Sequence, residues 1–187
     1  MPQEPLAWQP RAGLTAQLRA TEPGTPVVYA VTGLPGAGKT QIAAAYAREC
    51  VNEGWRLIAW VNAETLPETL AGLALVAARL GIAADGLDAD AAGQRVRNWL
   101  EADGERCLVV FDNVTNIAAL RQYVPAAGRC QVVLTSTSES TASLGSPVPV
   151  EAFTRSESLA YLAARTRLTD TGGPRELSDA RGGRHRR

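Results

Sequence analysis

Short runs of consecutive apolar residues recur along this chain, separated by longer segments in which apolar residues are spaced as on one face of a helix. The first of these runs lies between Pro26 and Gly33, two residues that commonly bound a strand. Runs without polar interruptions are typical of strands buried on both faces of a parallel sheet. The pattern predicts strands at residues 27–31, 57–61, 107–111 and 131–134, and a short fifth strand at 147–150.

Helices are predicted in the segments before and between these strands. Thr65 and Glu68 stand at the spacing of a capping box, and Thr154 and Glu157 repeat that spacing. The predicted helices cover residues 14–19, 41–52, 65–80, 91–102 and 154–165. Alternating buried strands and helices indicate an α/β fold of three layers, in which a mainly parallel sheet of about five strands is covered on both sides.

The same pattern suggests how the chain is divided. Residues 1–24 form an N-terminal arm, and residues 25–152 hold all of the predicted strands. Residues 153–174 are interpreted as the start of a helical subdomain, so a partial C-terminal helical segment follows the α/β fold. Residues 175–187 are rich in arginine and glycine without periodicity, which predicts a disordered tail.

One octapeptide directly after the first strand carries the strongest chemical indication. Gly33-Leu34-Pro35-Gly36-Ala37-Gly38-Lys39-Thr40 fits the phosphate-binding P-loop pattern, and Lys39 is the only lysine among nineteen basic residues. The loop amides would cradle a diphosphate, Lys39 would neutralise phosphate charge, and the Thr40 hydroxyl would coordinate Mg²⁺. A strand before the loop and a helix after it indicate a P-loop NTPase. The predicted nucleotide-binding residues of this segment are Gly33, Pro35, Gly36, Ala37, Gly38, Lys39, Thr40 and Gln41.

Two later strand ends carry polar residues that fit the same site. Asp112 follows the apolar residues 108–111, which is the Walker B arrangement, and Thr135 follows the run 131–134. Because ligands of parallel sheets bind beyond the carboxyl ends of the strands, the P-loop, Asp112 and Thr135 are expected at one edge of the sheet. Asp112 is therefore predicted to hold the metal together with Thr40, and Thr135 to contact the nucleotide.

The residue after Asp112 bears on catalysis. Asn113 can orient a water molecule but cannot accept its proton, so Asp112 and Asn113 are predicted to form a weak catalytic pair. Glu64, just past the second predicted strand, is an alternative acid, although a glutamate near a helix cap is the favoured interpretation.

Composition narrows the classes of function. The formal net charge is zero, so there is no global electrostatic case for nucleic acid, and the terminal arginines 184, 186 and 187 are interpreted as part of a solvated tail. No apolar run approaches the roughly 20 residues of a membrane span, and the N-terminus lacks the pattern of a signal peptide. Three widely spaced cysteines and a single histidine, His185, fit neither a zinc site nor a histidine-based dyad. We expect a cytoplasmic protein.

These segments, taken in order, resemble the NB-ARC family of STAND nucleotide switches in its bacterial form. The resembling segments are 8–11 with Leu14 and Leu18, 33–43, 59–64, 108–114 and 132–137. The resemblance implies that Arg11 of the arm contacts the nucleotide. The chain departs from the family at Asn113, where a second aspartate is usual, and at Thr137, where a sensor arginine is usual. It is also expected to be truncated near Gly182-Gly183, at the family's Gly-Leu-Pro-Leu motif.

The expected function is an ADP- or ATP-binding regulatory module that uses Mg²⁺ and hydrolyses ATP weakly or not at all. One alternative is an active small P-loop ATPase or kinase. Another is a non-catalytic remnant that acts through protein contacts alone. The expected partners are an adenine nucleotide and, beyond it, other proteins or a second copy of the chain; a membrane and a nucleic acid are not expected.

Overall fold

The computed structural model describes residues 1–5, 7–19, 27–83 and 88–166. The strands are β1 Val27–Thr32, β2 Leu57–Asn62, β3 Cys107–Asp112, β4 Gln131–Ser136 and β5 Ser146–Pro149. The helices are α1 Ala12–Arg19, α2 Lys39–Asn52, α3 Leu66–Arg79, α4 Ala89–Asp103, α5 Ile117–Leu120 and α6 Arg155–Thr166, with 3₁₀ turns η1 Arg121–Tyr123 and η2 Glu139–Leu144. Every predicted strand and helix is therefore present, with its ends displaced by one or two residues at most.

The five strands form one sheet in the order β2-β3-β4-β1-β5, and every pairing is parallel. This confirms the predicted parallel sheet. β5 lies at the edge beside β1, a place that suits Pro147 and Pro149 because a proline cannot donate to a further strand. β3, β4 and β1 are neighbours in the middle of the sheet, so their carboxyl ends lie side by side.

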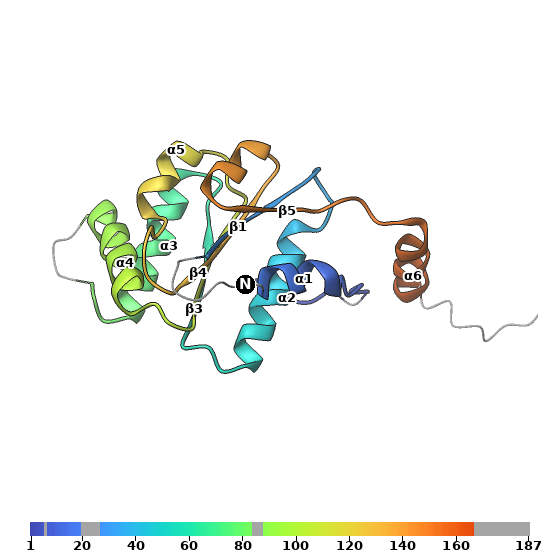
Figure 1. The fold of residues 1–187 in the computed structure, drawn as a ribbon, viewed down its shortest axis with the longest axis horizontal. Helices are drawn as coiled ribbons and strands as arrows, with labels where there is room; N and C mark the ends of the chain where they lie inside the picture. The colour runs from blue at the N-terminus through green and yellow to red at the C-terminus, as the bar shows by residue number, and fades with distance from the viewer. Residues whose placement is uncertain (6, 20–26, 84–87, 167–187) are drawn as a thin grey trace, which may run out of the picture.

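Helices cover both faces of the sheet, with α1 and α2 on one face and α3, α4 and α5 on the other (Figure 1). The pleat of β3 shows the division: Val110 is buried with Ile42 of α2, whereas its neighbour Val109 is buried with Leu73 of α3 and Leu100 of α4. The three predicted layers are therefore confirmed.

Three short elements were not predicted from the sequence. α5 begins after Asn116, whose side-chain oxygen accepts a hydrogen bond from the N–H of Ala119 at 3.0 Å. η1 follows α5 directly, and η2 connects β4 to β5. Elements of three to six residues show too little of a helical period to be recognised from the spacing of apolar residues.

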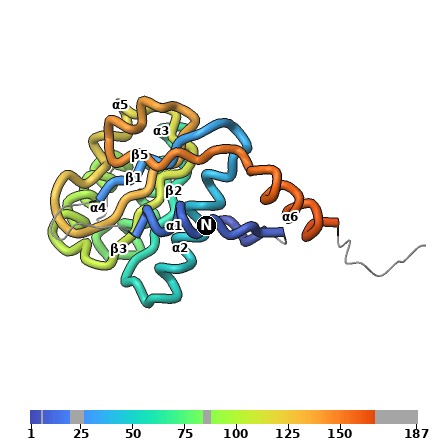
Figure 2. Tube along the Cα trace, turned by 45° about the vertical axis from the view of Figure 1, so that its right-hand side comes forward, coloured from blue at the N-terminus to red at the C-terminus, as the bar shows by residue number. Residues whose placement is uncertain are grey.

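α6 lies at one end of the molecule, away from the sheet (Figures 1 and 2). Its predicted capping box is present, because the N–H of Thr154 donates to Glu157 Oε2 at 2.7 Å and the N–H of Glu157 donates to Thr154 Oγ1 at 3.2 Å. No residue of α6 is buried. The predicted tail 175–187 and the last part of the predicted segment 153–174 lie outside the described residues. No helix within the described ranges has both the length and the apolar character needed to cross a membrane.

Candidate functional site

The P-loop turns away from β1 on glycines with positive φ. The φ angles of Gly33, Gly36 and Gly38 are 146°, 78° and 92°, which residues with a side chain rarely adopt. At Gly33 there is also no room, because an added Cβ would lie 2.2 Å from the carbonyl oxygen of Val150. Gly33 is therefore needed both for the turn and for the close passage of the chain that leaves β5.

The loop ends where α2 begins. Gly38 is the N-cap of α2 and provides no side-chain hydrogen bond to the helix. The first backbone N–H groups of a helix have no acceptor within the helix, and the helix dipole makes this end favourable for negative charge. The arrangement of the loop and helix is thus the one that binds phosphate groups.

Lys39 is held against the loop in this structure. Its Nζ donates to the carbonyl oxygens of Gly33 at 2.9 Å and Leu34 at 2.8 Å. Burial lowers the pKa of Lys39, an effect that the nearby Asp112 carboxylate partly opposes. Two carbonyl oxygens compensate the ammonium only in part, so an anionic ligand in reach of Nζ would be a stronger partner than either.

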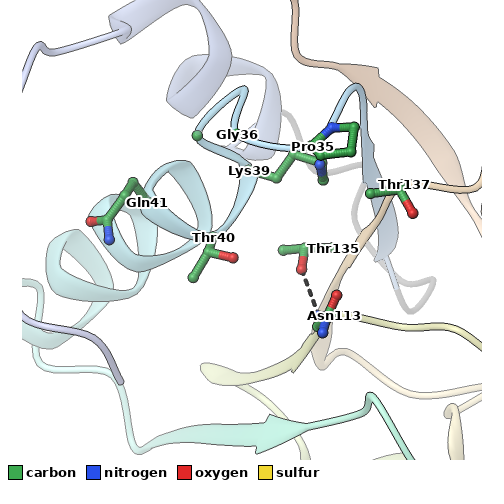
Figure 3. A pocket seen from close by; sticks show the side chains of 9 residues that line it. Pro35, Gly36, Lys39, Thr40, Gln41, Asn113, Thr135 and Thr137 are labelled. Atoms are coloured by element: carbon green, nitrogen blue, oxygen red, sulfur yellow. Dashed lines mark hydrogen bonds between the residues drawn. The ribbon is translucent and has the colours of Figure 1, made fainter.

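The ends of β3 and β4 meet Thr40 through a network of hydrogen bonds. Asp112 Oδ1 accepts from Thr40 Oγ1 at 2.8 Å and from Thr135 Oγ1 at 2.5 Å. Thr135 Oγ1 in turn accepts from the backbone N–H of Asn113 at 2.8 Å (Figure 3). Asn113 has a φ of 64°, in the left-handed region that asparagine and aspartate tolerate better than other side chains. The predicted meeting of the P-loop, Asp112 and Thr135 at one edge of the sheet is therefore present.

These oxygens fit a magnesium ion that is bound together with phosphates. Mg²⁺ commonly takes one or two protein oxygens and completes its shell with water and phosphate oxygens. Thr40 Oγ1 and Asp112 Oδ1 are only 2.8 Å apart, so both donors lie at one point of the site. In the part of the chain that the structure describes, no group of three or more His, Cys, Asp or Glu side chains could hold a metal ion. A magnesium ion here would therefore need the phosphates of the nucleotide as further ligands.

A cavity of about 380 Å³ opens at this edge of the sheet, and Figure 3 shows the side chains around it. We call it the phosphate cavity; its lining residues are Pro35, Gly36, Gly38, Lys39, Thr40, Gln41, Asn113, Thr135 and Thr137. Glu64 does not line it. That residue is exposed, and its carbonyl oxygen accepts a hydrogen bond from Thr115 Oγ1 at 2.6 Å. This position agrees with the interpretation of Glu64 as a glutamate near a helix cap.

A second cavity, of about 400 Å³, lies beside the same loop. We call it the aromatic cavity; its lining residues are Pro5, Ala7, Trp8, Gln9, Arg11, Gly36, Ala37, Gly38, Gln41, Ile42, Phe153 and Tyr161. The rings of Phe153 and Tyr161 are 5.9 Å apart between centroids. Trp8 comes from the N-terminal arm, so segments from opposite ends of the chain form the walls of this cavity.

Arg11 lies in the aromatic cavity and not in the phosphate cavity. Its Nε donates to Glu157 Oε1 at 3.2 Å, and its Nη1 donates to the carbonyl oxygen of Glu151 at 2.9 Å. The guanidinium carbon is 5.5 Å from the centre of the Phe153 ring. Hydrogen bonds from Thr154, together with Arg11, hold the pKa of Glu157 below its usual value, so the carboxylate is ionised at neutral pH. Arg11 therefore joins the arm to the first turn of α6.

The aromatic cavity was not predicted from the sequence. In the sequence, Trp8 and Arg11 are distinguished only by the family resemblance, and no local pattern distinguishes Phe153 or Tyr161. A site formed by residues some 150 positions apart leaves no trace in the spacing of neighbouring residues. The one indication of this cavity in the sequence is the presence of two aromatic residues, Phe153 and Tyr161, in the otherwise largely polar segment 153–174.

Comparison with known proteins places this site in a family. The model of the NB-ARC domain matches residues 13–166, a range that contains the P-loop, β3 and β4. None of the curated proteins compared with the chain matches it. The match to the NB-ARC domain supports a nucleotide-binding P-loop module of regulatory or ATPase type.

Solved structures share the fold. The ORC2 protein of Aeropyrum pernix, in ADPNP–ADP complexes, superposes with a TM-score of 0.60 at 19% identity over 89% of this chain and 54% of that chain. CDC6P of Pyrobaculum aerophilum superposes with a TM-score of 0.57 at 14% identity, over 86% and 51% of the two chains. This chain thus spans about half the length of these structures. At this level of identity the likeness concerns the fold alone.

Proposed function

This chain belongs to the NB-ARC family, and we propose that it is a regulatory switch module that binds ADP or ATP with Mg²⁺ and hydrolyses ATP slowly. The observation that carries the proposal is the network in which Asp112 Oδ1 accepts hydrogen bonds from both Thr40 and Thr135 beside the P-loop. It gathers a carboxylate and a P-loop hydroxyl at the place where a nucleotide-bound metal would sit.

The phosphate groups would occupy the phosphate cavity. The amides from Gly36 to Thr40 would surround the β-phosphate, since the glycines leave the loop backbone uncovered. Lys39 would exchange its two carbonyl partners for phosphate oxygens. Mg²⁺ would supply charge neutralisation between the phosphates when bound, with Thr40 and Asp112 as its protein ligands.

The adenine base would occupy the aromatic cavity. Gly36 and Gly38 line both cavities, so one ligand can extend from the first into the second around the loop. The aromatic cavity is lined largely by apolar and ring-bearing side chains, which suits a flat base. Arg11 would act here as a wall of the base subsite and not as a phosphate ligand.

Slow hydrolysis follows from what surrounds the place of the γ-phosphate. The carboxylate beside this place belongs to Asp112, which accepts hydrogen bonds from Thr40 and Thr135 and would hold the metal. No described residue that lines the phosphate cavity itself carries a carboxylate or an imidazole to take a proton from water. Lys39 is the single cation among those lining residues, and Thr137 stands where an arginine would stabilise the charge of the transition state. Such a site binds a nucleotide more effectively than it cleaves one, which is the behaviour of a switch.

A switch must also pass its nucleotide state to another protein or to a second copy of the chain. We propose that α6, as the first helix of a helical subdomain, takes part in this signalling. It exposes Leu159 and Leu162 to 59% and 53%, and these are the apolar side chains that a protein contact would cover.

The test is to identify and quantify nucleotide that co-purifies with the protein, and to measure thermal unfolding with and without ADP and Mg²⁺. A ligand present at 100 times its Kd stabilises a protein by about 2.7 kcal/mol, which corresponds to roughly 5–10 °C in Tm for a domain of this size. We expect a shift of this order for the wild type and none for Lys39→Ala. Arg129→Ala is the matched control, because its side chain is 66% exposed and does not line either cavity. Equal Tm values with and without millimolar nucleotide would refute the proposal.

A further inference from the structure

The two cavities meet at three residues, Gly36, Gly38 and Gln41. The glycines contribute backbone only, so among the described residues Gln41 is the one side chain at the junction. It follows Thr40 on the first turn of α2 and projects from the helix on the side away from Thr135 and Asn113 (Figure 3). Whatever part of a ligand connects the contents of the two cavities must pass this side chain.

Gln41 also has an unsatisfied hydrogen-bonding group. Its Oε1 is buried and has no hydrogen-bond partner among the described residues. A buried acceptor without a donor destabilises a protein, so such groups are uncommon and call for an explanation. The terminal torsion of glutamine is broad, so a donor at the junction would draw Oε1 toward it by rotation about that torsion.

The groups of a nucleotide that would lie at the junction differ in whether they can donate a hydrogen bond to Gln41 Oε1. With the diphosphate over the P-loop and the base in the aromatic cavity, the α-phosphate and the ribose lie between them. An ionised phosphate has acceptors only, whereas each ribose hydroxyl has a proton to donate. The exocyclic amine of adenine is a donor too, but it sits on the far edge of the base, beyond the junction.

We propose that Gln41 reads the sugar of the bound nucleotide, with Oε1 accepting a hydrogen bond from a ribose hydroxyl. The protein would then select ribonucleotides over deoxyribonucleotides. This inference rests on the proposed function, since it needs a nucleotide that spans both cavities. It adds a specificity that neither the P-loop nor Asp112 can supply, because those groups contact phosphate and metal.

The experiment compares affinities by isothermal titration calorimetry with Mg²⁺ present. The ligands are ADP, 2′-deoxy-ADP, 3′-deoxy-ADP and inosine diphosphate, which lacks the exocyclic amine. The proteins are the wild type, Gln41→Met and the control Gln94→Met; Gln94 lies exposed on α4, where it bonds Asp90. Methionine keeps the length of the side chain and removes the strong acceptor.

For the wild type and for Gln94→Met we expect at least one of the two deoxy ligands to bind about tenfold more weakly than ADP, the usual result of leaving a buried acceptor unpaired. The affinity of Gln41→Met for ADP should equal its affinity for that deoxy ligand, so this variant should no longer discriminate between the two nucleotides. The wild-type comparison does not depend on how well any variant folds.

Four results would overturn the inference. Wild-type protein that binds ADP and both deoxy ligands equally would show that the sugar is not read, while the proposed function would stand. If Gln41→Met still binds ADP more tightly than the deoxy ligands, a group other than Gln41 recognises the ribose hydroxyl. If Gln41→Met no longer distinguishes ADP from inosine diphosphate but still distinguishes ADP from the deoxy ligands, Gln41 contacts the base and not the sugar. Failure of the wild type to bind ADP would reject the inference and the proposed function together.

Discussion

The phosphate cavity and the aromatic cavity lie beside one loop, yet different parts of the chain build them. The phosphate cavity takes its side chains from the P-loop and from the ends of β3 and β4. The relative positions of these ends are set by strand pairing, in which Val31 of β1 is opposite Thr135 and Phe111 of β3 is opposite Leu134. Its geometry therefore depends on the whole sheet.

The aromatic cavity depends on far fewer contacts. Its outer wall is formed by Trp8 of the arm and by Phe153 and Tyr161. Tyr161 lies on α6, and no residue of that helix is buried. Arg11 joins the two walls through Glu157 and the carbonyl oxygen of Glu151. Substitutions that strain the backbone of the P-loop should therefore alter folding and phosphate binding together. Changes at Arg11 should alter nucleotide affinity with little effect on stability.

The largest expected effect is that of Gly33→Ala, which tests the dependence of the phosphate cavity on the sheet. Its Cβ would lie 2.2 Å from the carbonyl oxygen of Val150, and its φ of 146° is unfavourable for alanine. Strain and overpacking together should destabilise the protein by roughly 2–5 kcal/mol. Chemical denaturation by urea, followed by tryptophan fluorescence, measures this as a lower midpoint.

Gly36→Ala is the matched control for that substitution. Gly36 also has a positive φ, of 78°, but an added Cβ there would meet no atom within 4 Å. Its effect on stability should be smaller, about 1–2 kcal/mol, although a methyl group on the loop would still hinder a phosphate. Equal destabilisation by the two variants would contradict the claim that Val150 fixes the loop to the sheet edge.

A smaller effect is expected when Arg11 is replaced by alanine. Arg11 is only 12% exposed, so its removal should loosen the wall between the arm and α6 and weaken ADP binding by about tenfold. Inorganic pyrophosphate, which reaches only the phosphate cavity, should bind with unchanged affinity. Glu157→Gln removes only the negative charge that pairs with Arg11. It should weaken ADP binding by about threefold, as is usual for partly exposed ion pairs. Calorimetry with both ligands checks this.

The free energy of unfolding should change little in either variant, which separates Arg11 from Gly33. Arg129→Ala serves again as the control for loss of a positive charge, since its ion pair with Glu105 is exposed on both sides. A parallel loss of pyrophosphate and ADP affinity in Arg11→Ala would show that the two cavities are not separable in the way their contacts suggest.

The difference between the cavities also explains how much could be predicted from the sequence. Buried strands and the P-loop follow local patterns, and the rule that parallel strands present their carboxyl ends at one edge was enough to bring Asp112 and Thr135 to Thr40. The positive φ of Asn113 and the approach of Val150 to Gly33 could not be predicted, because they arise from how loops pass each other in three dimensions.

The aromatic cavity could be predicted least. Arg11 was expected to contact the nucleotide through the family resemblance, and that role stays a prediction, but its ion pair with Glu157 joins residues 146 positions apart. No periodicity or motif encodes such a contact. The short elements α5 and η2 could not be predicted for a related reason. α5 is stabilised by the Asn116 cap, and in η2 the Thr141 hydroxyl donates to the carbonyl oxygen of Ser138, so neither depends on an apolar face with a helical period.

A modest effect on turnover is expected when Asn113, which lines the phosphate cavity, is replaced by aspartate. Asn113 is placed by its backbone, whose N–H donates to Thr135 Oγ1 and whose φ of 64° suits aspartate equally well. Asn113→Asp should therefore keep the fold and add a carboxylate that can accept a proton from water.

A general base can contribute 10²–10⁴-fold to the rate of hydrolysis when the rest of a site is complete. Because Thr137 supplies no positive charge for the γ-phosphate, we expect only about a tenfold rise in phosphate release, measured in single turnover with ATP and Mg²⁺. The rise should vanish when Lys39→Ala is added. Unchanged release in Asn113→Asp alone would mean that the absent cation at Thr137, and not the absent acid, limits hydrolysis.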